Sequence, residues 1–120
     1  MTDSYVILYP ILSPLVDGNA YPDYIPEQKH KVKPPYIIYR EISAVADNVL
    51  DEFLETEYTR VQIDVYHTTH LACRKLSNQI ITAMLSNISH CEYVSRQRLY
   101  DPDTTLARYS MDFQFFINLD

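Results

Sequence analysis

The side chains best suited to chemistry gather around one predicted helix. They are the nitrogen and sulfur ligands that zinc prefers: His67, His70, Cys73, His90 and Cys91. The helix is predicted over residues 70–88, and a rise of 1.5 Å per residue places His70 and His90 about 30 Å apart. Bonds to zinc are only about 2 Å long, so the two ends of this helix cannot share one ion within a chain.

The remaining trio, His67, His70 and Cys73, has a simpler structural interpretation. Histidine and threonine suit the turn where a strand passes into a helix, and a cysteine at helical spacing behaves as a small core residue. His90 lies near the end of the helix, where a protonated imidazole interacts favourably with the helix dipole. We therefore predict no metal site and no cofactor.

Nucleophilic and acid–base catalysis lack a recognisable motif in this sequence. Two acidic pairs are candidates for a general acid and base: Glu55 with Glu57, and Asp101 with Asp103. Both pairs lie in turn-like stretches, where solvated carboxylates are ordinary. Gly18 is the only glycine, which argues against a phosphate-binding loop. We predict no catalytic residues.

Length and charge narrow the class of protein further. A chain of 120 residues fits one domain, residues 1–120, with a core large enough to need no disulfide or metal. The formal charge is −6 without any run of Lys or Arg, which disfavours a nucleic-acid clamp. No signal peptide and no apolar stretch of about 20 residues is visible, so we expect a soluble protein of the cytoplasm.

Two helices are predicted. Asp3 or Ser4 can cap a short helix of one or two turns, which Pro10 should kink or split. The second helix covers residues 70–88 behind an N-cap at Thr68 or Thr69. Its apolar residues recur at steps of three and four: Leu71, Ala72, Leu76, Ile80, Ala83, Met84 and Ile88.

Four strands are predicted from β-branched and aromatic alternation, over residues 36–43, 60–66, 91–100 and 107–119. Residues 20–35 hold four prolines and suggest an irregular excursion with one short edge strand. Residues 44–58 suggest an acidic connection with room for a helical turn. This order predicts an α+β fold, in which a long helix and a short N-terminal helix pack on one face of a mainly antiparallel sheet.

The last strand presents a strong core face, formed by Tyr109, Met111, Phe113, Phe115, Ile117 and Leu119. The opposite sheet face is predicted to be polar yet to carry aromatic residues, which is typical of solvent-exposed faces and of wet oligomer interfaces. The candidate interface residues are Tyr39, Gln62, Asp64, Tyr66, Arg96, Arg98, Asp112, Gln114 and Phe116. The two arginines are expected to oppose the acids across strands or across subunits.

Three segments together resemble a known family. They are "PPYIIYREIS" (residues 34–43), "TRVQIDVY" (residues 59–66), which follows a "Leu-Asp" pair at Leu50 and Asp51, and "HLACRKLSNQIITAML" (residues 70–85). This succession is similar to the tail-completion family of tailed phages and prophages, which includes tail terminators and proteins like minor tail protein U. The resemblance covers roughly residues 25–85.

The resemblance implies a structural, non-enzymatic protein that forms a ring, commonly a hexamer, on the finished tail tube. The implied partners are further copies of the chain, the tail tube protein and the head–tail joining protein. The protein would assemble in the host cytoplasm and reside at the tail–head junction. Residues 20–35 and 44–58 are expected to contact the neighbouring tail or head proteins.

The residues alone leave two other functions possible. One is a small α+β ligand-binding or dimerisation module of the cytoplasm. The other is a zinc-dependent enzyme that uses His67, His70 and Cys73.

Overall fold

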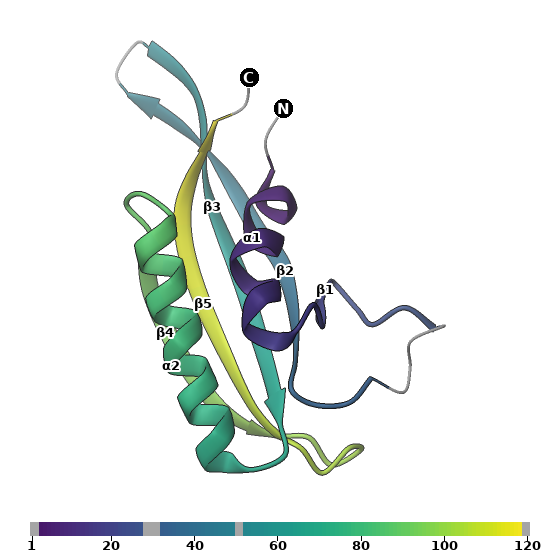
Figure 1. The fold of residues 1–120 in the computed structure, drawn as a ribbon. Helices are drawn as coiled ribbons and strands as arrows, with labels where there is room; N and C mark the ends of the chain where they lie inside the picture. The colour runs from purple at the N-terminus through teal and green to yellow at the C-terminus, as the bar shows by residue number, and fades with distance from the viewer. Residues whose placement is uncertain (1–2, 28–31, 50–51, 119–120) are drawn as a thin grey trace.

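The computed structural model describes residues 3–27, 32–49 and 52–118. These residues form two α-helices, one 3-10 helix and a five-stranded sheet (Figure 1). In chain order the elements are α1 (Ser4–Leu12), η1 (Ser13–Val16), β1 (Ala20–Pro22), β2 (Tyr36–Val49), β3 (Glu52–His67), α2 (His70–Asn87), β4 (Glu92–Tyr100) and β5 (Ala107–Asn118). Neither α1 nor α2 is both long and apolar enough to cross a membrane.

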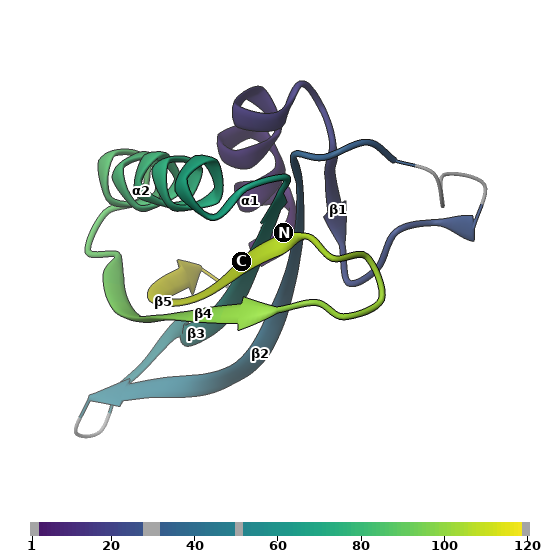
Figure 2. The same ribbon diagram turned by 90° about the horizontal axis from the view of Figure 1, so that it is seen from below.

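The sheet has the strand order β1-β2-β3-β5-β4. The short edge strand β1 is parallel to β2, and the other neighbouring strands are antiparallel. Both helices lie on the same side of the sheet, as the view along the strands shows (Figure 2). The predicted α+β fold, with a mainly antiparallel sheet and helices on one face, is therefore confirmed.

The first helix begins as predicted but passes through its proline. Asp3 accepts a hydrogen bond from the Val6 backbone N–H at 3.0 Å, which caps the helix. The helix is not split at Pro10 and continues to Leu12. The proline removes one backbone hydrogen bond. Leu8 and Leu12 are fully buried on either side of it, so packing on the sheet holds the helix together.

The second helix agrees closely with its prediction, because its N-cap is Thr69 and it runs over His70–Asn87. One residue of the predicted apolar stripe was assigned wrongly. Leu71 is 63% exposed, and Cys73 occupies the buried position in this first part of the helix. The helix packs on the sheet through Cys73, Leu76, Ile80 and Met84, and Leu71 lies off this face.

Residues 44–58 were predicted wrongly as a connection with a helical turn. They continue β2 and β3, which remain paired out to Val49 and Glu52. Strand β5 leaves β3 at the pair Thr56 and Asn118, so the hairpin beyond this point is a two-stranded ribbon. We call residues 47–49 and 52–55 the β2–β3 arm, and it projects beyond the helices in Figure 1. The longest dimension of the molecule is 51 Å. Leu50 and Asp51 lie outside the described residues.

The core lies between the sheet and both helices. Val61, Ile63 and Val65 of β3 are fully buried, as the alternation in this strand predicted. The core face predicted on β5 is also buried at Tyr109, Met111, Phe113, Phe115 and Ile117, while Leu119 lies outside the described residues. Ile80 and Met84 of α2 complete this layer beside Leu8 and Leu12 of α1.

Two phenylalanines of β5 give a matched test of this layering. Phe113 is fully buried and Phe116 is 46% exposed on the other sheet face. Phe113→Ala should lower the free energy of unfolding by about 3–5 kcal/mol because it leaves a cavity. Phe116→Ala should cost about 1 kcal/mol or less. Urea denaturation followed by circular dichroism measures both, and equal losses for the two variants would contradict the assignment of faces.

Candidate functional site

His67, His70 and Cys73, at the end of β3 and the start of α2, make local structural contacts. The Cys73 Sγ is buried and donates to the backbone oxygens of Val65 and Ala107, at 3.4 and 3.5 Å. The His67 Nδ1 accepts from the Thr68 N–H at 2.8 Å. Among the described residues no group of three His, Cys, Asp or Glu side chains is placed to hold a metal ion. The trio therefore forms the joint between β3 and α2.

Burial makes both thiols poor nucleophiles. It raises the pKa of Cys73 and of Cys91 to about 11. Since only the thiolate reacts readily, neither cysteine is prepared for nucleophilic catalysis at neutral pH.

The main candidate site is the sheet face opposite the two helices, which we call the outer sheet face. No other described element of the chain covers its centre (Figure 2). The strand register places Arg40 of β2, Gln62 of β3 and Asp112 of β5 side by side on this face. Asp64 lies one step further along β3, opposite Ser110. The centre of the face is thus polar.

Asp64 organises this polar centre. Its Oδ2 lies 2.7 Å from the Arg108 Nη2 and 4.0 Å from the Arg40 Nη2. The Gln62 amide donates to Asp64 at 3.3 Å and to the Ser110 hydroxyl at 2.7 Å. The carboxylate is only 1% exposed, because these neighbours lie over it. A charge buried in this way needs such partners to be tolerated.

A second ion pair lies beside this cluster and is more accessible to solvent. The Arg60 Nη2 lies 2.7 Å from the Asp112 Oδ2, and the two side chains are 38% and 27% exposed. The Arg108 Nε is buried without a hydrogen-bond partner among the described residues. Ionic contacts therefore hold the outer sheet face in a fixed arrangement.

Aromatic side chains lie at both ends of the polar centre. At one end the rings of Tyr36 and Tyr66 stack with centroids 4.7 Å apart. At the other end Val45, Tyr58 and Phe116 form one row across three strands. The Tyr58 and Phe116 rings lie 4.8 Å apart, and Val45 is 61% exposed. This row is the exposed apolar part of the outer sheet face.

Six of the nine predicted interface residues lie on the outer sheet face: Gln62, Asp64, Tyr66, Asp112, Gln114 and Phe116. The other three lie on the helix side of the sheet, and their part in an interface stays a prediction. Tyr39 is 2% exposed, and its ring lies 6.1 Å from that of Tyr5 on α1. Arg96 pairs with Met111 and donates to Ser77 and Asn78 of α2, at 3.1 and 2.6 Å.

Arg98 pairs with the buried Tyr109 and so belongs to the same side as Arg96. The arginines that do oppose the acids are Arg40, Arg60 and Arg108, which the sequence reasoning missed. For two of these arginines, the alternation of side chains along the strand was a signal in the sequence. Arg60 shares the alternation of Gln62 and Asp64 in β3, and Arg108 shares that of Ser110 and Asp112 in β5.

The two ion pairs should differ in their contribution to stability. Asp64→Asn removes a buried carboxylate and leaves Arg108 without its partner, so the free energy of unfolding should fall by roughly 2–3 kcal/mol. Asp112→Asn breaks a solvent-accessible pair and should cost less than about 1 kcal/mol. Urea denaturation at neutral pH measures both changes. An Asp64→Asn variant as stable as Asp112→Asn would show that the Asp64 cluster does not organise this face.

Thiol reactivity offers a separate check of the surroundings of Cys73 and Cys91. With a pKa moved from 9.0 to about 11, each thiol holds about 100-fold less thiolate at pH 8. Reaction with a disulfide reagent such as DTNB should therefore be about 100-fold slower in the folded protein than in urea. The rate should rise as the pH approaches 11. Equal rates for the folded and unfolded chain would contradict the burial of Cys73 and the partial burial of Cys91.

Comparison with known proteins places these features in a family. Residues 10–118 match the family described as Tail completion protein gp17. A search of curated proteins gave no significant match. The family match begins within α1 and ends with β5, so it includes every strand of the sheet and also the terminal hairpin beyond the segments that carried the sequence resemblance. The chain therefore belongs to the tail-completion family of phage proteins.

Proposed function

We propose that this protein is a tail terminator, which forms a ring, expected to contain six copies, on the end of the phage tail tube and joins the tail to the head. The observation that carries the proposal is the outer sheet face of this member of the tail-completion family. Its side chains are held in place by ion pairs, and no described element of the chain covers its centre. A closed ring requires a contact between two different surfaces of each subunit. The outer sheet face supplies one such surface.

The composition of the outer sheet face supports its use as an interface. The row of Val45, Tyr58 and Phe116 offers aromatic and aliphatic area, which protein interfaces favour over isolated charges. The arginines beside it are already paired with acids of the same chain, so a partner would not have to desolvate free charges.

The proposed partners follow from this role. Besides further copies of the chain, they are the tail tube protein and the head–tail joining protein, for which the segment of residues 20–35 is the proposed contact. The role is structural and needs no catalysis, no cofactor, no membrane and no sequence-specific nucleic acid. We expect assembly in the host cytoplasm. The net charge of −6 would let DNA pass through the ring without adhering.

Deletion of the gene from the phage or inducible prophage that carries it tests the proposed function. Tube polymerisation should then continue past its normal end, because nothing caps the tube. Electron microscopy of the lysate should show overlong tails without heads beside filled heads without tails. Expression of the chain from a plasmid should restore normal virions. Normal virions from the deletion strain itself would refute the proposal.

A further inference from the structure

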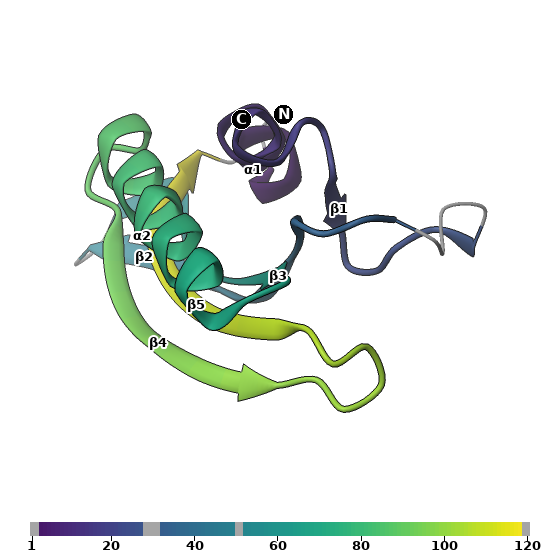
Figure 3. The same cartoon turned by 60° about the horizontal axis from the view of Figure 1, so that its bottom comes forward.

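The two edges of the sheet differ in how the chain protects them. On one side β1 is three residues long and ends at Pro22, and a short strand with a proline is a common protection of an edge. On the other side β4 is nine residues long, contains no proline and pairs only with β5 among the described strands. Figure 3 shows β4 as the outermost strand beside α2. None of the nine residues is buried, so β4 is an open edge of the described sheet.

A second open edge lies along β2, beyond the part that β1 covers. Strand β1 pairs with β2 only from Ile37 to Tyr39. The next position is covered by the Tyr5 hydroxyl, which accepts from the Glu41 backbone N–H at 3.3 Å. Over residues 42–46 no described strand pairs with this side of β2, and all of these residues are exposed. The sheet therefore has an open edge on each side, and the two edges belong to different strands.

The topology of the sheet determines how these two edges would meet in a ring. Strands β2 and β5 run in one direction and β3 and β4 in the other, because neighbouring strands among these four are antiparallel. A rotation about the ring axis does not reverse the direction of a strand along that axis. Strand β4 of one copy would therefore meet β2 of the next copy antiparallel, which is slightly more stable per residue than parallel pairing.

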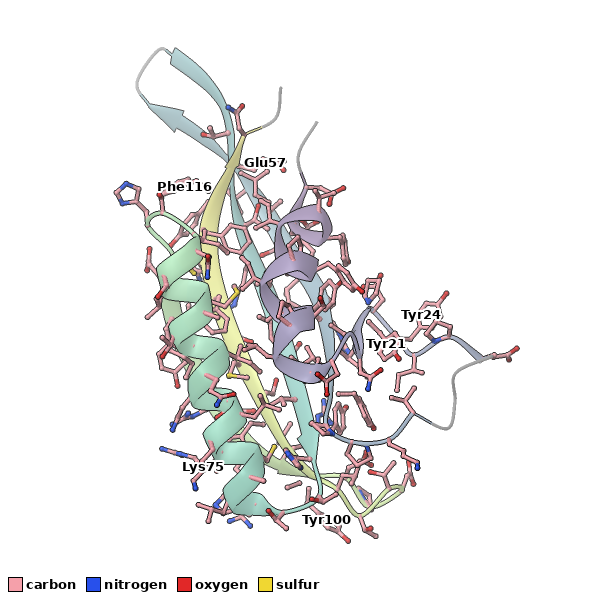
Figure 4. The ribbon with its side chains drawn as sticks, viewed as in Figure 1. Tyr21, Tyr24, Glu57, Lys75, Tyr100 and Phe116 are labelled. Carbon is pink, nitrogen blue, oxygen red and sulfur yellow. The ribbon has the colours of Figure 1, made fainter. Side chains whose placement is uncertain are left out.

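The two open edges are also offset along the sheet, as a closed ring of strands requires. The register places Glu41 of β2 level with Tyr93 of β4, so residues 42–46 lie beyond the start of β4. In Figure 4, Glu57 beside this part of β2 and Tyr100 at the end of β4 lie at opposite ends of the sheet. Alignment of the two edges needs a shift of about five residues, roughly 17 Å, over four strand spacings of about 19 Å in total. The resulting tilt of about 40° is within the roughly 35–45° of closed barrels.

Charge distinguishes the possible partners of β4. Arg96 and Arg98 lie on the helix side of this strand. In a two-fold pair of β4 strands centred at Gln97, Arg96 of each copy would lie opposite Arg98 of the other, and such like charges destabilise the pair. Glu41 also lies on the helix side, because it pairs with the buried Val61. Neither Glu41 nor Arg98 forms an ion pair with another described residue, so a contact between copies would give each a partner.

We propose that the β4 edge of one copy binds the open β2 edge of the next copy, with Arg98 beside Glu41. This inference rests on the proposed ring and names the strands that meet in it. Residues 93–97 pair with residues 43–46, and backbone hydrogen bonds between the two strands supply the affinity. The contact joins different edges of identical chains, which is the arrangement that a closed ring requires. It also makes the outer sheet faces of neighbouring copies continuous.

A charge exchange tests the contact between Arg98 and Glu41. In the deletion strain, Arg98→Glu and Glu41→Arg should each lower the titre of infectious phage about 10-fold or more, because like charges then meet at every junction of the ring. A chain with both substitutions again opposes unlike charges and should restore the titre to within about 3-fold of the wild-type chain. Lys75→Glu is the matched control, because Lys75 lies on α2 rather than on a strand edge, and it should complement fully (Figure 4). Full complementation by both single variants would refute the contact.

Cross-linking tests the pairing of the strands directly. Ser43 and Gln97 both lie on the outer sheet face, and the proposed register sets them opposite each other at each junction. Virions that carry the Ser43→Cys and Gln97→Cys chain should give a ladder of linked copies after treatment with a short bis-maleimide reagent and denaturing electrophoresis. The wild-type chain and either substitution alone should give no ladder. A chain with Ser43→Cys and Gln114→Cys is the matched control, because Gln114 lies on the interior strand β5.

The outcomes separate this pairing from the ring itself. If the Ser43→Cys and Gln97→Cys chain forms normal virions without a ladder, the pairing is refuted and the ring stands. Dimers from Gln97→Cys alone would indicate a two-fold β4 contact, and a link to a different protein would identify β4 as its binding strand; both results refute the pairing. Circular dichroism of each purified variant shows that it folds, and the charge exchange decides the matter if a cysteine variant does not complement. Normal virions from the deletion strain would refute the ring and the pairing together.

Discussion

The pairing of β3 with both β2 and β5 is the constraint on which the rest of the structure depends. Strand β3 is central in the sheet, and Val61, Ile63 and Val65 are fully buried against the helices. Alternation along a strand then forces Gln62 and Asp64 to the opposite face. With both helices on one side, the chain lacks a described layer for the other side. An antiparallel sheet with helices on one face is a complete two-layer fold, and its other face can meet solvent or a partner.

The outer sheet face is nevertheless ordered before any partner binds. Asp64 is buried by its own neighbours, and the Arg108 guanidinium lies 5.4 Å from the centroid of the Tyr66 ring. This stacking joins the polar centre to the Tyr36 and Tyr66 pair at one end. Ion pairs of this kind contribute little net stability, because desolvation offsets the attraction. Their effect is to fix which atoms of the face are available to a neighbour.

The sequence predicted those elements whose own periodicity is strong. Helix α2, the core of β3 and the core face of β5 each repeat one pattern over many residues, so local reasoning found them. The β2–β3 arm was missed because its strands are acidic and gain their backbone hydrogen bonds only from each other. The β-propensity of individual residues does not indicate which strands pair with each other.

The register between strands decides on which side of the sheet Tyr39 and Arg96 lie. In β2 the neighbours Ile37 and Ile38 are both apolar, so alternation alone did not show that Tyr39 faces the helices. In β4 an irregularity between Tyr93 and Ser95 sets the phase of the strand, and it places Arg96 against Met111. A one-residue difference in phase moves a side chain to the other face. Bulges depend on the partner strand and leave little trace in the sequence.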